Sequence, residues 1–137
     1  MKIDKAEKKW GIKSITICKY IANGWIDCLQ ANGNEIILPD IPKPMKISCK
    51  NYDDSRIMEY IIKACNTNQY LSSYMLGISG EHFERLLECL VSEGYLTGKS
   101  ECGFSNVGYH VTAKKFNRNI QIINNINVEN NANLLKF

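Results

Sequence analysis

The sequence contains no apolar run that approaches the roughly 20 residues needed to cross a bilayer. The first ten residues, MKIDKAEKKW, have no apolar core of the kind found in secretory signal peptides. The second position is not glycine, and the last residues, NLLKF, form no prenylation box, so the common lipid-attachment motifs are also missing. These absences predict a soluble cytoplasmic protein.

The sequence also lacks closely spaced cysteines. A structural zinc site needs thiolates at short spacings, and a secreted disulfide scaffold is a shorter chain with denser cysteine. We therefore expect reduced thiols that act as small apolar side chains, with no bound metal and no cofactor. No Cys-x-x-Cys pair occurs among the six cysteines, which are Cys18, Cys28, Cys49, Cys65, Cys89 and Cys102.

Patterns typical of catalytic sites are absent. The two histidines, His82 and His110, have no neighbouring sequence that suggests a nucleophile and its base. Gly103 and Gly108 are too far apart to form a loop that cradles a phosphate group. The chain is therefore predicted not to be an enzyme.

What the sequence does contain is an ordinary globular composition with an uneven distribution of charge. Hydrophobic residues make up 45% and charged residues 23%, values that support a folded core. Residues 1–50 carry nine lysines and five acidic residues, a balance of +4, whereas residues 51–137 carry eight basic and nine acidic residues, a balance of −1. A basic segment beside a neutral one is consistent with a first half that meets a polyanion, but lysines that only solvate a small surface give the same charge, and charge alone favours that interpretation.

All three prolines fall in one short stretch, which marks a division of the chain. Pro39, Pro42 and Pro44 remove backbone donors and favour extended geometry, as is typical of a semi-rigid linker. We predict a mainly α fold with short β-wings, an α+β class in which two small winged helix-turn-helix domains stand in tandem. The predicted segments are a DNA-binding helix-turn-helix with a β-wing over 1–44, a linker over 45–53, a winged-helix-like domain over 54–118 and an asparagine-rich tail over 119–137.

Local signals give the first segment two helices and a hairpin. Apolar residues at helical spacing predict a first helix that ends at Gly11 and a second helix from about Ser14 to Ala22. The chain from Trp25 to Ala31 then has an extended pattern. Asn32-Gly33 is a strong signal for a tight turn, and Glu35 to Leu38 is predicted to return as the partner strand.

The 54–118 segment begins with the signals of three helices. Asp54 or Ser55 is expected to cap a helix that runs to about Asn66, and Ser79 is expected to cap a helix with a complete apolar stripe. Between these two, a short helix is predicted to begin at Tyr70. This order of helices is that of a winged helix.

The same segment is predicted to end with two strands, over 95–98 and 109–111, joined by a loop. Thr112 can cap a last helix, which Ile120 and Ile123 could continue into the tail. Asparagine is a poor helix former, so this end of the chain is expected to fray.

The residues from Ala6 to Pro44 carry a pattern that occurs in one class of regulators. This segment resembles the short helix-turn-helix, excisionase-like domains of bacterial and mobile-element regulators, which are related to the MerR DNA-binding domain. The resemblance implies a DNA-binding transcriptional regulator, either a repressor or an excisionase-like protein of a mobile element. The pattern is a turn, an apolar second helix, a Gly-x-Ile segment, a wing and a proline-rich exit, here Trp10-Gly11-Ile12, Ile17 with Ile21, Gly24-Trp25-Ile26, Asn32-Gly33 and Pro39 to Pro44.

A second pattern covers about residues 56–116 and resembles the YjcQ-like winged-helix family, which implies a fold. The shared features are an apolar first helix, Leu76-Gly77-Ile78-Ser79 before the third helix, Glu93-Gly94-Tyr95-Leu96 after it, and Val111-Thr112 at the end.

The third helix of that segment has an acidic exposed face with Glu81, Glu84 and Glu88. Such a face repels a duplex. We therefore expect the second domain to mediate dimerisation or another protein contact, and a homodimer to form through this domain or through the C-terminal tail.

The second predicted helix and the wing supply the candidate contacts to double-stranded DNA. A recognition helix must offer donors to phosphates and polar groups to base edges. Lys13 and Lys19 are expected to neutralise phosphates, but no arginine precedes Arg56, so the strongest guanine reader is missing. The complete candidate set is Lys13, Ser14, Thr16, Lys19, Tyr20, Asn23, Gln30, Asn32 and Asn34.

Other interpretations of these residues stay open. Tyr20 has an equal claim as a half-buried ring that supports its helix, and Trp10 and Trp25 are expected to pack in the core or the wing. Ile15 and Cys18 stand where polar or basic residues are common in such helices. The alternative function is therefore a protein-interaction adaptor on a winged-helix scaffold without DNA binding.

Overall fold

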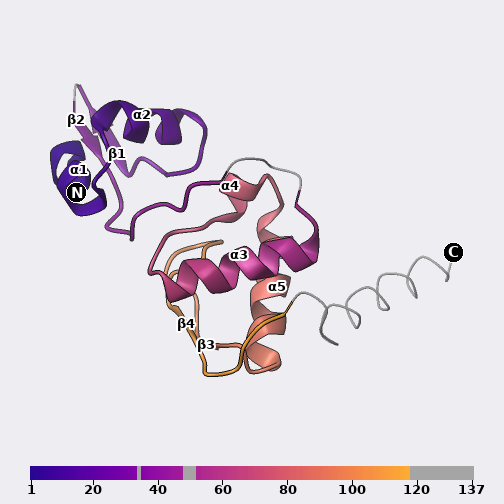
Figure 1. Ribbon diagram of the computed structural model, residues 1–137. Coiled ribbons are helices and arrows are strands. Elements are labelled where there is room, and N and C mark those ends of the chain that lie inside the picture. The colour runs from indigo at the N-terminus through magenta and orange to yellow at the C-terminus, as the bar shows by residue number, and fades with distance from the viewer. Residues whose placement is uncertain (34, 48–51, 118–137) are drawn as a thin grey trace, which may run out of the picture.

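The computed structural model describes residues 1–33, 35–47 and 52–117, which form a mixed α+β fold (Figure 1). These residues contain five helices and two two-stranded antiparallel sheets, so the predicted mixture of helices and short strands is confirmed. In chain order the elements are α1 (Ile3–Trp10), α2 (Ser14–Ala22), β1 (Gln30–Asn32), β2 (Glu35–Ile37), α3 (Asp54–Asn66), α4 (Ser73–Leu76), α5 (Gly80–Ser92), β3 (Leu96–Gly98) and β4 (Tyr109–Val111).

Both helices predicted in the first half are confirmed. Gly11 ends α1 in the left-handed conformation, at φ 67°, where a side chain would be strained. Its N–H donates to Glu7 O at 2.9 Å and so closes the last turn. α2 begins at Ser14, and Lys13 precedes it without a side-chain capping bond.

The hairpin forms, but its turn and the approach to it differ from the prediction. Asn32 is paired with Glu35, which moves the turn one residue beyond Asn32-Gly33. The prediction of an extended chain from Trp25 to Ala31 is wrong for most of that segment. Residues 23–26 form a turn in which Trp25 N–H donates to Tyr20 O at 2.9 Å, so the strand begins only at residue 30.

α3 and α5 form as predicted, with a shift in one cap. Asp53, rather than Asp54 or Ser55, caps α3, and its carboxylate accepts a bond from Arg56 N–H at 2.8 Å. Ser79 caps α5 as predicted, with its hydroxyl oxygen accepting a backbone N–H of the first turn at 3.1 Å. Both caps satisfy donors that the start of a helix leaves without partners.

α4 is shorter than predicted because the backbone of Tyr70 forms hydrogen bonds with a distant part of the chain. Tyr70 N–H donates to Lys43 O, and Met45 N–H donates to Tyr70 O, both at 2.8 Å. These bonds hold the chain around Tyr70 in an extended bridge with Pro44. The helix therefore begins at Ser73.

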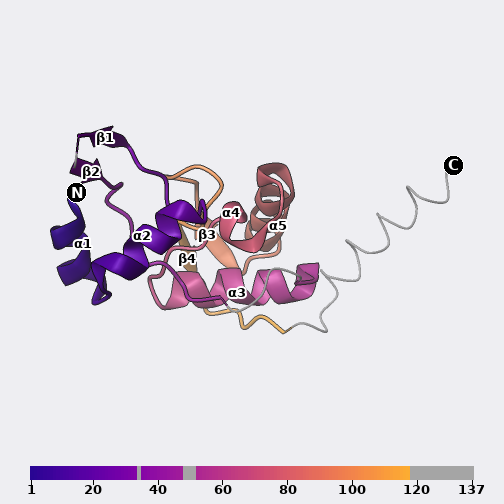
Figure 2. The same cartoon turned by 90° about the horizontal axis from the view of Figure 1, so that it is seen from above.

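The described part of the connection between the two halves is packed rather than solvated. Leu38, Ile41, Met45 and Ile47 are buried and belong to one apolar cluster that also contains residues of both halves. Figures 1 and 2 show the first half lying beside the second half, with this connection running past α4. The proline-rich stretch is thus part of the core that joins the two halves.

The helix predicted after Thr112 is not formed within residues 112–117. Thr112 Oγ1 donates instead to Gly94 O at 2.6 Å, which ties the end of β4 to the end of α5. The predicted continuation through Ile120 and Ile123 lies outside the described residues. Among the residues that are described, none of the helices has the length and apolar character required to traverse a membrane.

Candidate nucleic-acid interface

α2 is anchored through one side and leaves most of its surface in solvent. Ile17 is its buried residue, and Ile21 is partly buried against the same core. On α1, Trp10 is buried and its Nε1 donates to Ile41 O at 3.0 Å, which confirms its predicted place in the core. In Figure 1, α2 lies at the top of the first half, and in Figure 2 it lies between α1 and the second half.

The residues on and beside α2 that are predicted to contact DNA divide into two groups. Thr16 and Tyr20 are half-buried, and the Tyr20 ring stacks on Trp25 with centroids 5.0 Å apart and planes 26° apart. This stacking favours the interpretation of Tyr20 as a ring that supports the helix. The exposed group contains Lys13, Ser14, Lys19 and Asn23.

The structure describes only some of the wing residues that are predicted to contact DNA. Gln30 and Asn32 lie on β1, and Asn34 lies outside the described residues. The hairpin is joined to the amino terminus by a bridge between Lys2 and Ile37. This bridge fixes the hairpin beside the start of α1.

Two lysines near α1 are paired with acidic side chains. Lys2 Nζ lies 2.7 Å from Glu35 Oε1, and this hydrogen bond and charge raise the pKa of Lys2. Lys9 bonds to Asp40 and holds the pKa of that carboxyl below its usual value. All four side chains are solvent-exposed, so these pairs contribute little stability. They do reduce the positive charge available to a ligand around α1.

The lysines at the two ends of α2 have no such partners. Within the described residues, no carboxylate oxygen lies within 4.0 Å of the Lys13 or Lys19 nitrogen. α2 itself contains no acidic residue. The first-turn N–H groups of a helix add partial positive charge at the Lys13 end. The outer side of α2 is therefore electropositive, with no acidic side chain in contact with its lysines in the described part of the chain.

The same side of α2 carries exposed apolar groups. Ile15, the second residue of the helix, is 63% exposed, and Cys18 is exposed one turn later. Leu29, which the sequence reasoning did not single out, is 65% exposed just before β1. Isolated exposed apolar residues are common, but one at the start of a cationic helix is available to any ligand of that helix.

The second half presents a different surface. Glu81, Glu84 and Glu88 are exposed on α5 beside Arg85, around a shallow open hollow. His82 Nε2 lies 2.7 Å from Asp54 Oδ1, a contact that ties α5 to the first turn of α3. The predicted acidic face is therefore present and repels a polyanion.

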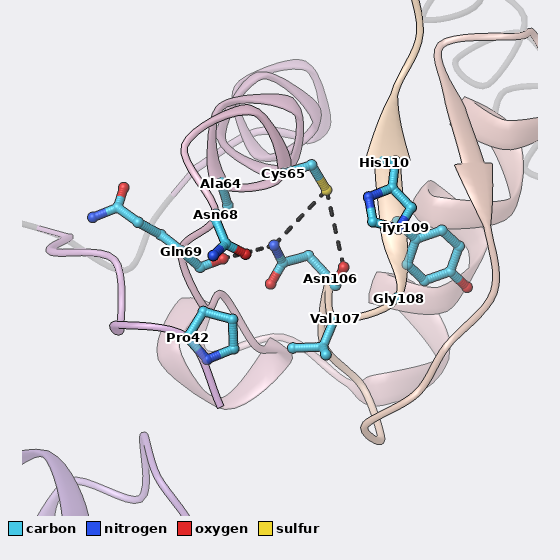
Figure 3. Close-up of a pocket in the computed structure, with 10 residues that line it drawn as sticks. All are labelled: Pro42, Ala64, Cys65, Asn68, Gln69, Asn106, Val107, Gly108, Tyr109 and His110. Carbon is cyan, nitrogen blue, oxygen red and sulfur yellow. Dashed lines mark hydrogen bonds between the residues drawn. The ribbon is translucent and has the colours of Figure 1, made fainter. Parts of the chain in front are cut away.

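A buried asparagine that sequence reasoning missed organises the second half (Figure 3). Asn106 is 4% exposed, its Oδ1 accepts Leu71 N–H at 2.7 Å, and its Nδ2 donates to Gln69 O at 2.8 Å. Its Nδ2 also donates to Cys65 Sγ at 3.8 Å. No sequence signal marks this residue, because its partners come from segments far away along the chain.

Asn106 borders a small cleft of about 70 Å³ that residues of the connection, α3 and β4 also line. The polar atoms of Asn106 are already engaged by the protein, so it is a structural group. Burial raises the pKa of Cys65, against a smaller opposing effect of the bond from Asn106. A raised pKa keeps this thiol protonated at neutral pH and makes it a poor nucleophile.

Among the described residues, no group of three or more histidine, cysteine, aspartate or glutamate side chains is arranged to hold a metal ion. Comparison with protein-family models, with curated proteins and with solved structures finds no match for the chain.

Proposed function

We propose that the chain is a DNA-binding transcriptional regulator that inserts α2 into the major groove of a duplex. The observation that carries the proposal is the exposed outer side of α2, where Lys13 and Lys19 have no acidic partner among the residues that the structure describes. Phosphate neutralisation by such lysines supplies most of the affinity of non-specific DNA binding. Ser14, at the start of the helix, is available to a base edge or a phosphate.

The proposal includes two winged-helix units in tandem. In the first unit the order is α1, α2 and the β1–β2 hairpin, which the bridge between Lys2 and Ile37 extends. In the second unit, α3 is followed by a bridge between Ser72 and Ser105, then by α4, α5 and the β3–β4 pair. Both orders match a helix-turn-helix followed by a wing, which supports the resemblance of the sequence to regulator domains.

The second unit is assigned a role in protein contact rather than in DNA reading. Glu81, Glu84 and Glu88 on α5 would face the phosphates if that helix entered a groove, and they would be repelled. A homodimer formed through this unit, or through the tail beyond the described residues, would present two α2 helices to half-sites about 34 Å apart. Doubling the contacts would offset the lack of arginine in the first unit.

Under this proposal the chain acts in the cytoplasm as a repressor or an excisionase-like protein of a mobile element. It performs no catalysis and needs no metal or cofactor. The DNA is read in the first unit, and the state of assembly is set in the second.

A second candidate function, a protein-interaction adaptor, is favoured by the exposed apolar groups of the first half. Ile15 and Leu29 are 63% and 65% exposed, and Cys18 is exposed between them in the sequence. A protein partner would cover these groups and leave the lysines of α2 unimportant.

The two functions are separated by an electrophoretic mobility shift of a mixed-sequence duplex at low salt. We expect Lys13→Ala and Lys19→Ala each to weaken binding by about tenfold or more, because a hydrogen bond to a charged group contributes at least that much. Lys99→Ala, an exposed lysine between β3 and β4, is the matched control and should bind as the wild type does. Equal losses in all three variants, or no shift of the wild type, would overturn the proposal.

A further inference from the structure

The exposed residues of α2 restrict how the helix can read a base sequence. From its first to its last residue, the exposed side chains are Ser14, Ile15, Cys18, Lys19 and Ala22. None of them carries a guanidinium or an amide group. Lys19 is the one residue of this set whose type can contact guanine in this way, and it stands in the last turn, where the proposed function assigns it to a phosphate, so bidentate reading of guanine or adenine from these positions is restricted.

One major-groove feature is still readable by such a helix. The 5-methyl group of thymine is the apolar group that distinguishes thymine in the major groove, and apolar side chains are its usual partners. Ile15 is the second residue of α2 and is 63% exposed. Residues near the start of a recognition helix are those that meet base edges. The position and the chemistry of Ile15 thus agree.

The surroundings of Ile15 favour a nucleic-acid occupant for this face. Lys13 and Lys19 stand on either side of it in the sequence, and both are exposed without an acidic partner among the described residues. This charge complements two flanking phosphates. On the anchored side, Ile17 is fully buried, so the helix is held with Ile15 in solvent.

We infer that Ile15 is a specificity-determining residue that packs against thymine 5-methyl groups, so that the site bound by α2 is thymine-containing duplex DNA. The inference rests on the proposed function. Cys18, exposed one turn later, extends the apolar contact along the groove. 5-Methylcytosine carries its methyl group at the same place in the groove and should substitute for thymine at a contacted position.

The test begins with selection of the best-bound duplexes from a pool with a randomised centre, using the full chain. The selected duplex is then made with deoxyuridine in place of each thymidine, which removes only the 5-methyl groups. We expect the wild type to bind the uracil duplex about fourfold more weakly for each contacted methyl group, the factor expected for one CH₂ group left in water.

Variants of Ile15 separate this contact from a general effect of uracil. Ile15→Ala should lose most of the preference for the thymine duplex, with any remainder owed to Cys18, and Ile15→Val should keep most of it. Leu29→Ala removes an equally exposed apolar side chain outside α2 and should leave the preference unchanged. Circular dichroism confirms that each variant is folded, as expected at exposed positions.

The possible results separate the role of Ile15 from the proposed DNA-binding function. Equal binding of both duplexes by the wild type, with tight salt-sensitive binding retained, would overturn the role of Ile15 and leave the proposed function intact. The same holds if Ile15→Ala keeps the wild-type preference, as it would if this side chain served a protein partner. No binding of any duplex would overturn both claims.

Discussion

Replacing Asn106 with alanine is expected to destabilise the fold by about 2–4 kcal/mol, because two backbone groups lose a side-chain partner. In the structure, Asn106 accepts Leu71 N–H at 2.7 Å and donates to Gln69 O at 2.8 Å. A buried polar group without a partner costs about 1–3 kcal/mol, so two such groups cost about 2–6 kcal/mol. The neighbouring cleft of about 70 Å³ can admit water, which needs only a fraction of that volume, and this favours the lower half of the range.

The assay is urea denaturation followed by circular dichroism. Asn66→Ala is the matched control, because Asn66 is an exposed amide at the end of α3 and its loss should change stability by no more than about 0.5 kcal/mol. Asn106→Asp keeps an acceptor for Leu71 N–H but places a buried carboxylate against Gln69 O, so at neutral pH it should be at least as destabilising as Asn106→Ala. If Asn106→Ala were as stable as Asn66→Ala, the assignment of Asn106 as the organising group of the second half would be refuted.

Three further outcomes are expected from the same kind of measurement. Trp10→Phe removes a buried donor from a backbone carbonyl and should cost about 1–3 kcal/mol, whereas Trp25→Phe should cost less, because the buried Trp25 Nε1 has no acceptor among the described residues. Met45→Ala should cost about 2–5 kcal/mol and Lys46→Ala almost nothing; equal effects would mean that the connection is not packed. Burial raises the pKa of Tyr70 to about 12, so the folded state favours the neutral phenol. The contribution of this group to the stability of the fold is complete below about pH 10 and is lost as the pH rises through about 12. Tyr70→Phe should lessen this alkaline loss in denaturation curves recorded across that range, and an unchanged pH profile would contradict it.

Signals that act within one turn or one helix were sufficient to predict much of the fold. Gly11 ends α1 because a left-handed residue is needed there, and Ser79 begins α5 because its hydroxyl accepts a first-turn N–H. The apolar stripe of α5 predicts which of its residues are buried, and Phe83, Leu86 and Leu90 are. In these cases the determining partner lies within a few residues in the sequence.

Features of the fold that depend on contacts between residues far apart in the sequence could not be predicted from the sequence. Tyr70 lies among residues at helical spacing, yet its backbone pairs with Lys43 and Met45 and α4 starts later. Trp25 belongs to an apolar stretch with an extended pattern, but it stacks on Tyr20 in the turn after α2. In both cases a tertiary contact outweighs the local preference of the chain.

The candidate interface shows the same division. The exposure of Lys13 and Lys19 follows from the apolar periodicity of α2, which places Ile17 inward. The sequence could not decide whether Tyr20 would face solvent or a neighbouring ring, because its partner lies beyond the end of the helix. The pairing of Lys2 with Glu35 and of Lys9 with Asp40 likewise depends on tertiary contacts.

The salt dependence of duplex binding tests the central claim most directly. The logarithm of the binding constant falls with the logarithm of salt concentration with a slope of about −0.9 for each phosphate neutralised. The double variant Lys13→Ala/Lys19→Ala should therefore reduce the magnitude of the slope by about 1.8, whereas Lys46→Ala/Lys99→Ala, two exposed lysines outside α2, should leave it unchanged. An identical slope for the wild type and the α2 double variant would contradict the account.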